Sequence, residues 1–129
     1  MKRTILTIIT LVFVSIAPVA LTGCWAVAAG AAGGTVAYVM GDLEAVRAEG
    51  LDQVYQATLD AMQQLEFSVT SKQKDALQAE VIARNAADKK ITVEMEKSTE
   101  DTTSINIRVG LFGDEEKSRM IYEKIVENL

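Results

Sequence analysis

The chain has 129 residues, one cysteine and no histidine, and its 13 Lys and Arg residues against 18 Asp and Glu give a net charge of −5. Without histidine the chain lacks the most frequent general base and metal ligand, so we expect no catalytic set, no metal and no cofactor. An acidic surface repels nucleic acid, which is therefore not an expected partner.

Residues 1–23 have the organisation of a secretory signal. Lys2 and Arg3 supply positive charge, and an uncharged apolar block runs from Thr4 to Ala20 with Pro18 near its end. A proline in this place breaks a helix and leaves the following residues extended for a peptidase. The block is about as long as a short membrane span. We nevertheless predict a cleaved signal, because a processing site follows at once, and an uncleaved anchor is the alternative.

The residues that follow form a lipobox, Leu21, Thr22, Gly23 and Cys24. They resemble the processing site of bacterial lipoprotein precursors. That resemblance implies cleavage before Cys24 and attachment of a diacylglycerol to its thiol, often with a further palmitate-like chain on the new amine. Two or three acyl chains hold a protein firmly to a membrane, whereas one does so only marginally. A free thiol or an intermolecular disulfide is the alternative use of this cysteine.

The anchor predicts a location in the bacterial cell envelope. Trp25 stands where the usual inner-membrane retention signal has Asp. This favours the outer membrane, facing the periplasm, if the organism is Gram-negative. Cleavage also removes Lys2 and Arg3 and no acid, which changes the net charge from −5 to −7.

Residues 24–34 are rich in Ala and Gly, and we interpret them as a flexible tether. Gly30 and Gly34 have the G-x-x-x-G spacing that lets helices approach closely in a bilayer. A membrane-organising glycine-zipper helix is therefore the alternative for this segment.

Residues 35–129 predict one α+β domain. Two β-prone runs, 35–40 and 43–48, flank Gly41 and predict one long strand that is bent or bulged there. Asp52 is the expected N-cap of a helix. The helix has an apolar stripe formed by Leu51, Val54, Thr58, Ala61, Met62 and Leu65.

Four strands with alternating apolar and polar residues are expected next, at 67–70, 77–84, 91–96 and 104–109, followed by a closing helix from Asp114. The order strand, helix, four strands, helix predicts a two-layer sandwich in which two helices cover one face of an antiparallel sheet of about five strands. The other face stays open and carries Thr92, Glu94, Glu96, Asn106 and Arg108.

Glu94 and Glu96 share this face and have the chemistry of an acid/base pair. Cross-strand ion pairs are the favoured interpretation. The expected cations are Arg84, Lys90, Lys97 and Arg108.

The acidic run from Asp114 to Glu116 is interpreted as helix capping rather than as a metal site. The loop Gly110–Gly113 lacks the ending of a phosphate loop and predicts a strand-to-helix turn with Phe112 under the closing helix. Isolated tyrosines at the edge of the core are expected at positions 38, 55 and 122.

From the lipobox onward the chain resembles a family of small bacterial lipoproteins known only as a domain of unknown function. The segments that carry the resemblance are the Gly-Cys site, residues 33–38, 54–58 and 69–72, and above all 107–110 with 112–114. The resemblance implies a secreted, lipid-anchored α+β domain without an assigned activity or known catalytic residues.

These features predict a non-enzymatic envelope lipoprotein that binds or scaffolds a protein partner through its sheet face or helix groove. A carrier of a small apolar ligand, or an enzyme accessory, with a pocket between helices and sheet is the alternative from another class.

Overall fold

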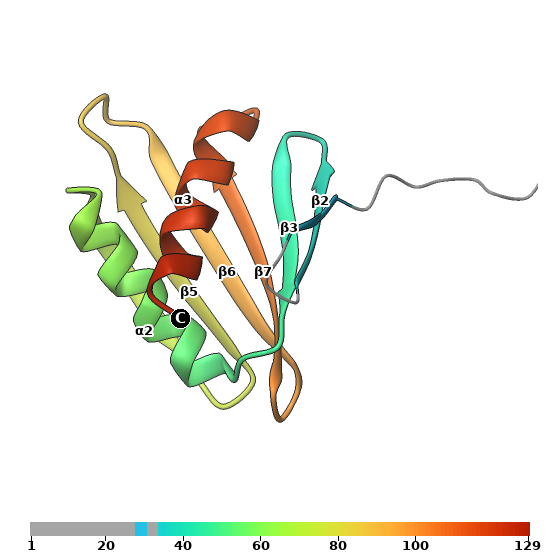
Figure 1. The fold of residues 1–129 in the computed structure, drawn as a ribbon. Coiled ribbons are helices and arrows are strands. Elements are labelled where there is room, and N and C mark those ends of the chain that lie inside the picture. Colours follow the sequence, from blue (N-terminus) through green and yellow to red (C-terminus); the bar gives the residue numbers. More distant parts are fainter. Residues whose placement is uncertain (1–27, 31–33) are drawn as a thin grey trace, which may run out of the picture.

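A computed structural model describes residues 28–30 and 34–129. Two helices cover one face of a single seven-stranded sheet (Figure 1), in which the strand order is β1-β2-β3-β7-β6-β5-β4. All neighbouring strands are antiparallel. The elements are β1 (Ala28–Gly30), β2 (Gly34–Val39), β3 (Asp42–Arg47), α2 (Leu51–Gln64), β4 (Ser68–Lys74), β5 (Gln78–Arg84), β6 (Lys90–Thr99), β7 (Thr102–Val109) and α3 (Glu115–Glu127).

The predicted two-layer α+β architecture is confirmed, but the strand count of about five is too low. One of the extra strands comes from the segment expected to be a single bent strand. That expectation is wrong, because the chain reverses at Met40 and Gly41 and separates β2 from β3. Both residues have positive φ, 53° and 88°, as in the type I′ turns of two-residue hairpins.

The other extra strand, β1, has three residues and lies within the segment expected to be a tether. Gly30 of β1 is paired with Gly34 of β2 across an antiparallel hairpin. The two glycines therefore lie opposite each other on neighbouring strands rather than on one face of a helix. No helix in the described part of the chain is long and apolar enough to cross a membrane.

Helix α2 connects β3 to β4 on the far edge of the sheet, so it crosses the strands that lie between them. Gly50 is its N-cap and no side chain caps it. The N-cap prediction for Asp52 is wrong, because Asp52 lies in the first turn, where its carboxylate still faces the positive end of the helix dipole. The predicted apolar stripe is buried apart from Leu65, which is half-buried.

Strands β4 to β7 form an antiparallel meander, as predicted, but several of them are longer than expected. Strand β4 continues to Lys74, beyond its expected end at residue 70, and a register shift lies between Val69 and Ser71. Strand β6 continues to Thr99, and its register against β7 shifts between Lys97 and Thr99.

The core lies between the helices and the sheet. Alternate residues of the central strands point toward the helices and are fully buried there, as the alternation predicts. Ile121 and Ile125 of α3 and Val54 and Met62 of α2 meet them. The other side of the sheet is covered by no described element (Figure 1).

Candidate functional site

The open face of the sheet carries a row of carboxylates and amides that crosses five strands. The strand register sets Glu80 of β5 opposite Glu94 of β6, and Glu94 opposite Asn106 of β7. Gln73 of β4 extends the row on one side and Glu44 of β3 on the other. We call these five residues the carboxylate–amide row.

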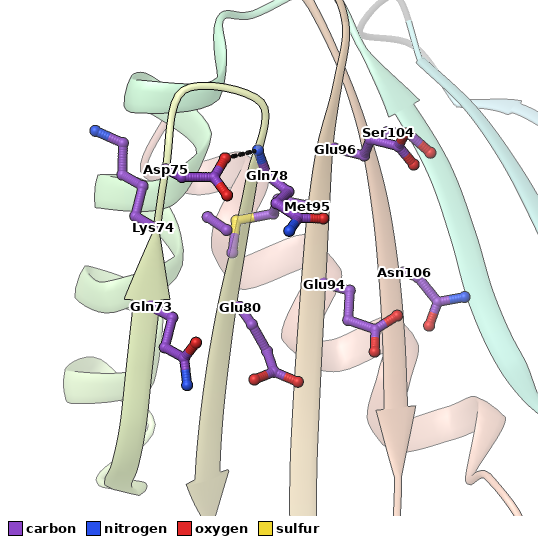
Figure 2. A pocket seen from close by; sticks show the side chains of 11 residues that line it. Gln73, Lys74, Asp75, Gln78, Glu80, Glu94, Met95, Glu96, Ser104 and Asn106 are labelled. Carbon is purple, nitrogen blue, oxygen red and sulfur yellow. Dashed lines mark hydrogen bonds between the residues drawn. The ribbon is translucent and has the colours of Figure 1, made fainter.

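A shallow hollow of about 610 Å³ lies over four members of this row, all except Glu44. Figure 2 shows Glu80, Glu94 and Asn106 side by side on neighbouring strands, with the helices behind the sheet. Glu96 and Ser104, which are paired across β6 and β7, lie beside them. The lining is polar, and its charged groups are mostly carboxylates, so the hollow suits a partner that brings positive charge and hydrogen-bond donors.

The turn between β4 and β5 forms one rim of the hollow and is held by Asp75. Its Oδ1 accepts hydrogen bonds from the backbone N–H groups of Leu77 and Gln78, at 2.8 and 2.9 Å. The second of these bonds is drawn in Figure 2. Both stabilise the charged carboxylate and lower the pKa of Asp75 below its ordinary value. The rim is therefore a fixed Asx-type turn.

The predicted cross-strand ion pairs of Glu94 and Glu96 do not form within the described part of the chain. Arg108 instead binds Asp42 of β3, with its Nε 2.8 Å from Asp42 Oδ1. Its pKa is raised mainly by these hydrogen bonds, with a smaller contribution from the charge of Glu94. Arg84 pairs with Asp88.

Lys97 likewise pairs elsewhere, with Glu100 in the β6–β7 turn. No ion pair among the described residues includes Glu80, Glu94 or Glu96. The predicted neutralisation fails because Arg84, Lys97 and Arg108 bind other carboxylates, and Lys90 forms no ion pair with any described residue. The acidic charge of the row is thus left facing solvent.

The acidic run at the start of α3 is a helix cap, as predicted. Asp114 accepts a hydrogen bond at 3.1 Å from the backbone N–H of Lys117. The Lys117 ammonium lies 2.6 Å from the same carboxylate and lowers the pKa of Asp114. Glu115 pairs with Arg119 one turn later. The described residues include no group of three or more His, Cys, Asp or Glu arranged to hold a metal ion.

The predicted strand-to-helix turn at Gly110–Gly113 is confirmed, but the position of Phe112 is wrong. Its side chain is 87% exposed instead of packing under α3. Gly110 and Gly113 have positive φ, 75° and 77°. These backbone conformations carry the loop away from the core. Tyr38 and Tyr55 are half-buried, and Tyr122 is buried at 8% exposure.

The lipobox residues Leu21, Thr22, Gly23 and Cys24 lie outside the described residues, so the predicted lipidation stays a prediction. The carboxylate–amide row was not predicted from the sequence, although two of its members, Glu94 and Asn106, were expected on the open face. The alternation of each strand identifies its outer face. Only the register between strands brings Glu80 opposite Glu94.

Comparison with known families gives one finding. The model of a family described only as a protein of unknown function (DUF3568) matches residues 7–128. No match was found among curated proteins. The family match covers all of the described helices and strands, and its description names no ligand, reaction or partner.

Proposed function

This chain belongs to the DUF3568 family of proteins of unknown function, and we propose that it is a lipid-anchored envelope protein with a non-catalytic binding module. The open sheet face docks a protein partner, and the anchor at Cys24 holds the module at a membrane. The outer membrane, on its periplasmic side, is the proposed location.

The anchor rests on the sequence. The charged start, the apolar block and all four lipobox positions agree, and Cys24 is the only cysteine of the chain. If the lipid occupies this thiol, Cys24 needs no second cysteine as a disulfide partner.

The observation that supports a binding face is the unpaired carboxylate–amide row. Like charges directly opposite each other on neighbouring strands destabilise a sheet, and Glu80 and Glu94 are such a pair. A face selected for stability alone would bring Arg108 or Lys90 against them. Carboxylates kept together at a cost in stability suggest a partner that supplies the positive charge, such as a Lys- and Arg-rich protein segment.

The alternative of an apolar ligand between helices and sheet has less support. That layer is filled by core side chains, among them Leu43, Met62, Ile105 and Ile121, each with no exposed surface. A ligand would have to displace them at a cost in packing.

The test of the anchor is Cys24→Ser in the native host. We expect this variant to lose acyl-chain labelling and to accumulate as the uncleaved precursor. Normal processing of the variant contradicts the anchor.

The test of the binding face is site-specific photo-crosslinking in intact cells from Asn106, which lies in the row. We expect a defined adduct that Glu94→Lys abolishes. Glu123→Lys, on the exposed side of α3, is the matched charge reversal and should leave the adduct unchanged. An adduct that responds equally to both substitutions, or to neither, contradicts docking through the row.

A further inference from the structure

Three large apolar side chains stand exposed together at one end of the molecule. Met40, in the β2–β3 turn, is 93% exposed, and Leu111 and Phe112, in the β7–α3 loop, are 84% and 87% exposed. We call these three residues the apolar tip. In Figure 1 the β2–β3 turn and the start of α3 lie at the same end of the sheet. Large apolar groups clustered in this way on a soluble surface mark a site of contact with a partner or a membrane.

The two loops of the tip are fitted to each other. A methyl group added at Gly41 would lie 2.6 Å from the carbonyl oxygen of Phe112, and one added at Gly113 would meet the backbone of Gly41. The bidentate pair of Arg108 with Asp42 fixes the start of β3, directly after Gly41. Asp114 caps α3 directly after Gly113. The tip is therefore presented by a braced structure, and the exposure of its side chains is built into the fold.

The direction of β1 relates the tip to the anchor. Ala28 is paired with Val36, and the two strands are antiparallel. Because β2 runs toward Met40, β1 runs away from the tip, and Ala28 is the end of β1 nearer to the tip. Only residues 25–27 separate Ala28 from Cys24, which limits the distance between these two residues to about 14 Å. An acylated Cys24 thus holds the domain close to the bilayer.

The charge around the tip also differs from that of the whole chain. Five Lys and Arg side chains and four carboxylates flank it, whereas the whole chain carries 13 Lys and Arg against 18 Asp and Glu. The flanking residues are Lys89, Lys90, Arg108, Lys117 and Arg119 with Asp42, Asp114, Glu115 and Glu116. The acidic excess that repels anionic headgroups is therefore missing at this end.

We propose that the apolar tip inserts into the interface of the bilayer that holds the acyl chains, and so orients the domain at the membrane. This inference rests on the proposed lipid anchor. A lipid chain supplies attachment but no orientation, and a second, weak contact on the same molecule becomes effective because the anchor keeps it at high local concentration. Met40, Leu111 and Phe112 supply the apolar groups, and the flanking cations remain at headgroup level.

The test uses the mature acylated protein in vesicles of phosphatidylethanolamine and phosphatidylglycerol. Acylation consumes the only native thiol, so Phe112→Cys gives a single site for an environment-sensitive fluorophore. Leu77→Cys is the matched control, since Leu77 is 66% exposed in the β4–β5 turn, at the other end of β5 from Arg84 and Lys90. We expect a blue shift and quenching by spin-labelled lipids at position 112 and neither effect at position 77.

Vesicle flotation and the mass of the protein separate this proposal from the anchor. If the protein floats and has the mass of the acylated form, but position 112 stays in water, the insertion of the tip is overturned and the anchor is not. Protein without acyl chains, which does not float, overturns the anchor. A shift of equal size at both positions overturns the proposed orientation. Crosslinking of position 112 to one protein in native membranes, without a shift in vesicles, assigns the tip to a protein contact and overturns insertion.

Discussion

Replacing Gly41 by alanine tests whether the two loops of the apolar tip hold each other. Gly110 provides the matched control, because its φ of 75° is close to the 88° of Gly41 but an added methyl group would meet nothing within 4 Å. A left-handed conformation costs an L residue about 1–2 kcal/mol. Part of this, about 0.4–1 kcal/mol, is offset because alanine restricts the unfolded chain. We therefore expect Gly110→Ala to lower the free energy of unfolding by about 1 kcal/mol.

Gly41→Ala adds a steric cost to the same conformational cost. Its methyl group would lie 2.6 Å from the carbonyl oxygen of Phe112, which is a backbone atom and moves only with its loop. Forced overpacking of this kind costs about 1–3 kcal/mol, so we expect a total loss of about 2–4 kcal/mol. Urea unfolding measures both variants in residues 24–129 with Cys24→Ser, produced without the signal segment. Equal losses for Gly41→Ala and Gly110→Ala would refute the contact between the loops.

Three further predictions concern the core, the open face and acid stability. Ile121→Ala should lower the free energy of unfolding by about 2–5 kcal/mol, whereas the neighbouring Met120→Ala, which is 43% exposed, should cost far less; comparable losses contradict the assigned face of α3. Glu94→Gln should raise the free energy of unfolding by about 0.2–1 kcal/mol, because it removes a like charge opposite Glu80. A lower free energy of unfolding, measured in urea, would contradict the repulsion between Glu80 and Glu94. The pKa of Asp114 is lowered in the folded protein, so its carboxylate contributes to the free energy of unfolding above the unfolded pKa of 3.8. This contribution is lost as the pH falls through the lower pKa of the folded state. Asp114→Asn should therefore flatten the decline of stability in this acid range, and an unchanged pH profile is the contrary result.

The layers of the fold follow from periodicity in the sequence. Helix stripes repeat with the helical period and strand residues alternate, so the buried faces of α2, α3 and β5 to β7 could be predicted. The β2–β3 hairpin could not, because Met40 is not a residue that favours a turn with positive φ. Gly41 followed by Asp42 was the available signal, and it fits a bulge equally well.

The candidate site and the tip were harder to predict for two different reasons. The carboxylate–amide row depends on the register between strands. This register shifts near Val69 and Lys97, and no local sequence pattern predicts these shifts. Phe112 was expected inside because of its apolar side chain. Hydrophobicity alone does not determine burial when the backbone on both sides, at Gly110 and Gly113, leads the loop outward.

The two proposals constrain each other through the direction of the strands. Met40 and Phe112 lie where strands β2 and β7 end, so a tip in the bilayer makes the strands rise from the membrane surface rather than lie on it. The open face, with Glu80 and Glu94, then looks sideways along the membrane, neither pressed against lipid nor turned away from it. Such a face is presented to a partner held at the same surface. If the tip stays in water, a tethered domain presents the row in all directions, and a freely diffusing partner becomes equally accessible. The depth of position 112 in the bilayer therefore indicates whether the partner of the row is held at the membrane surface or diffuses freely.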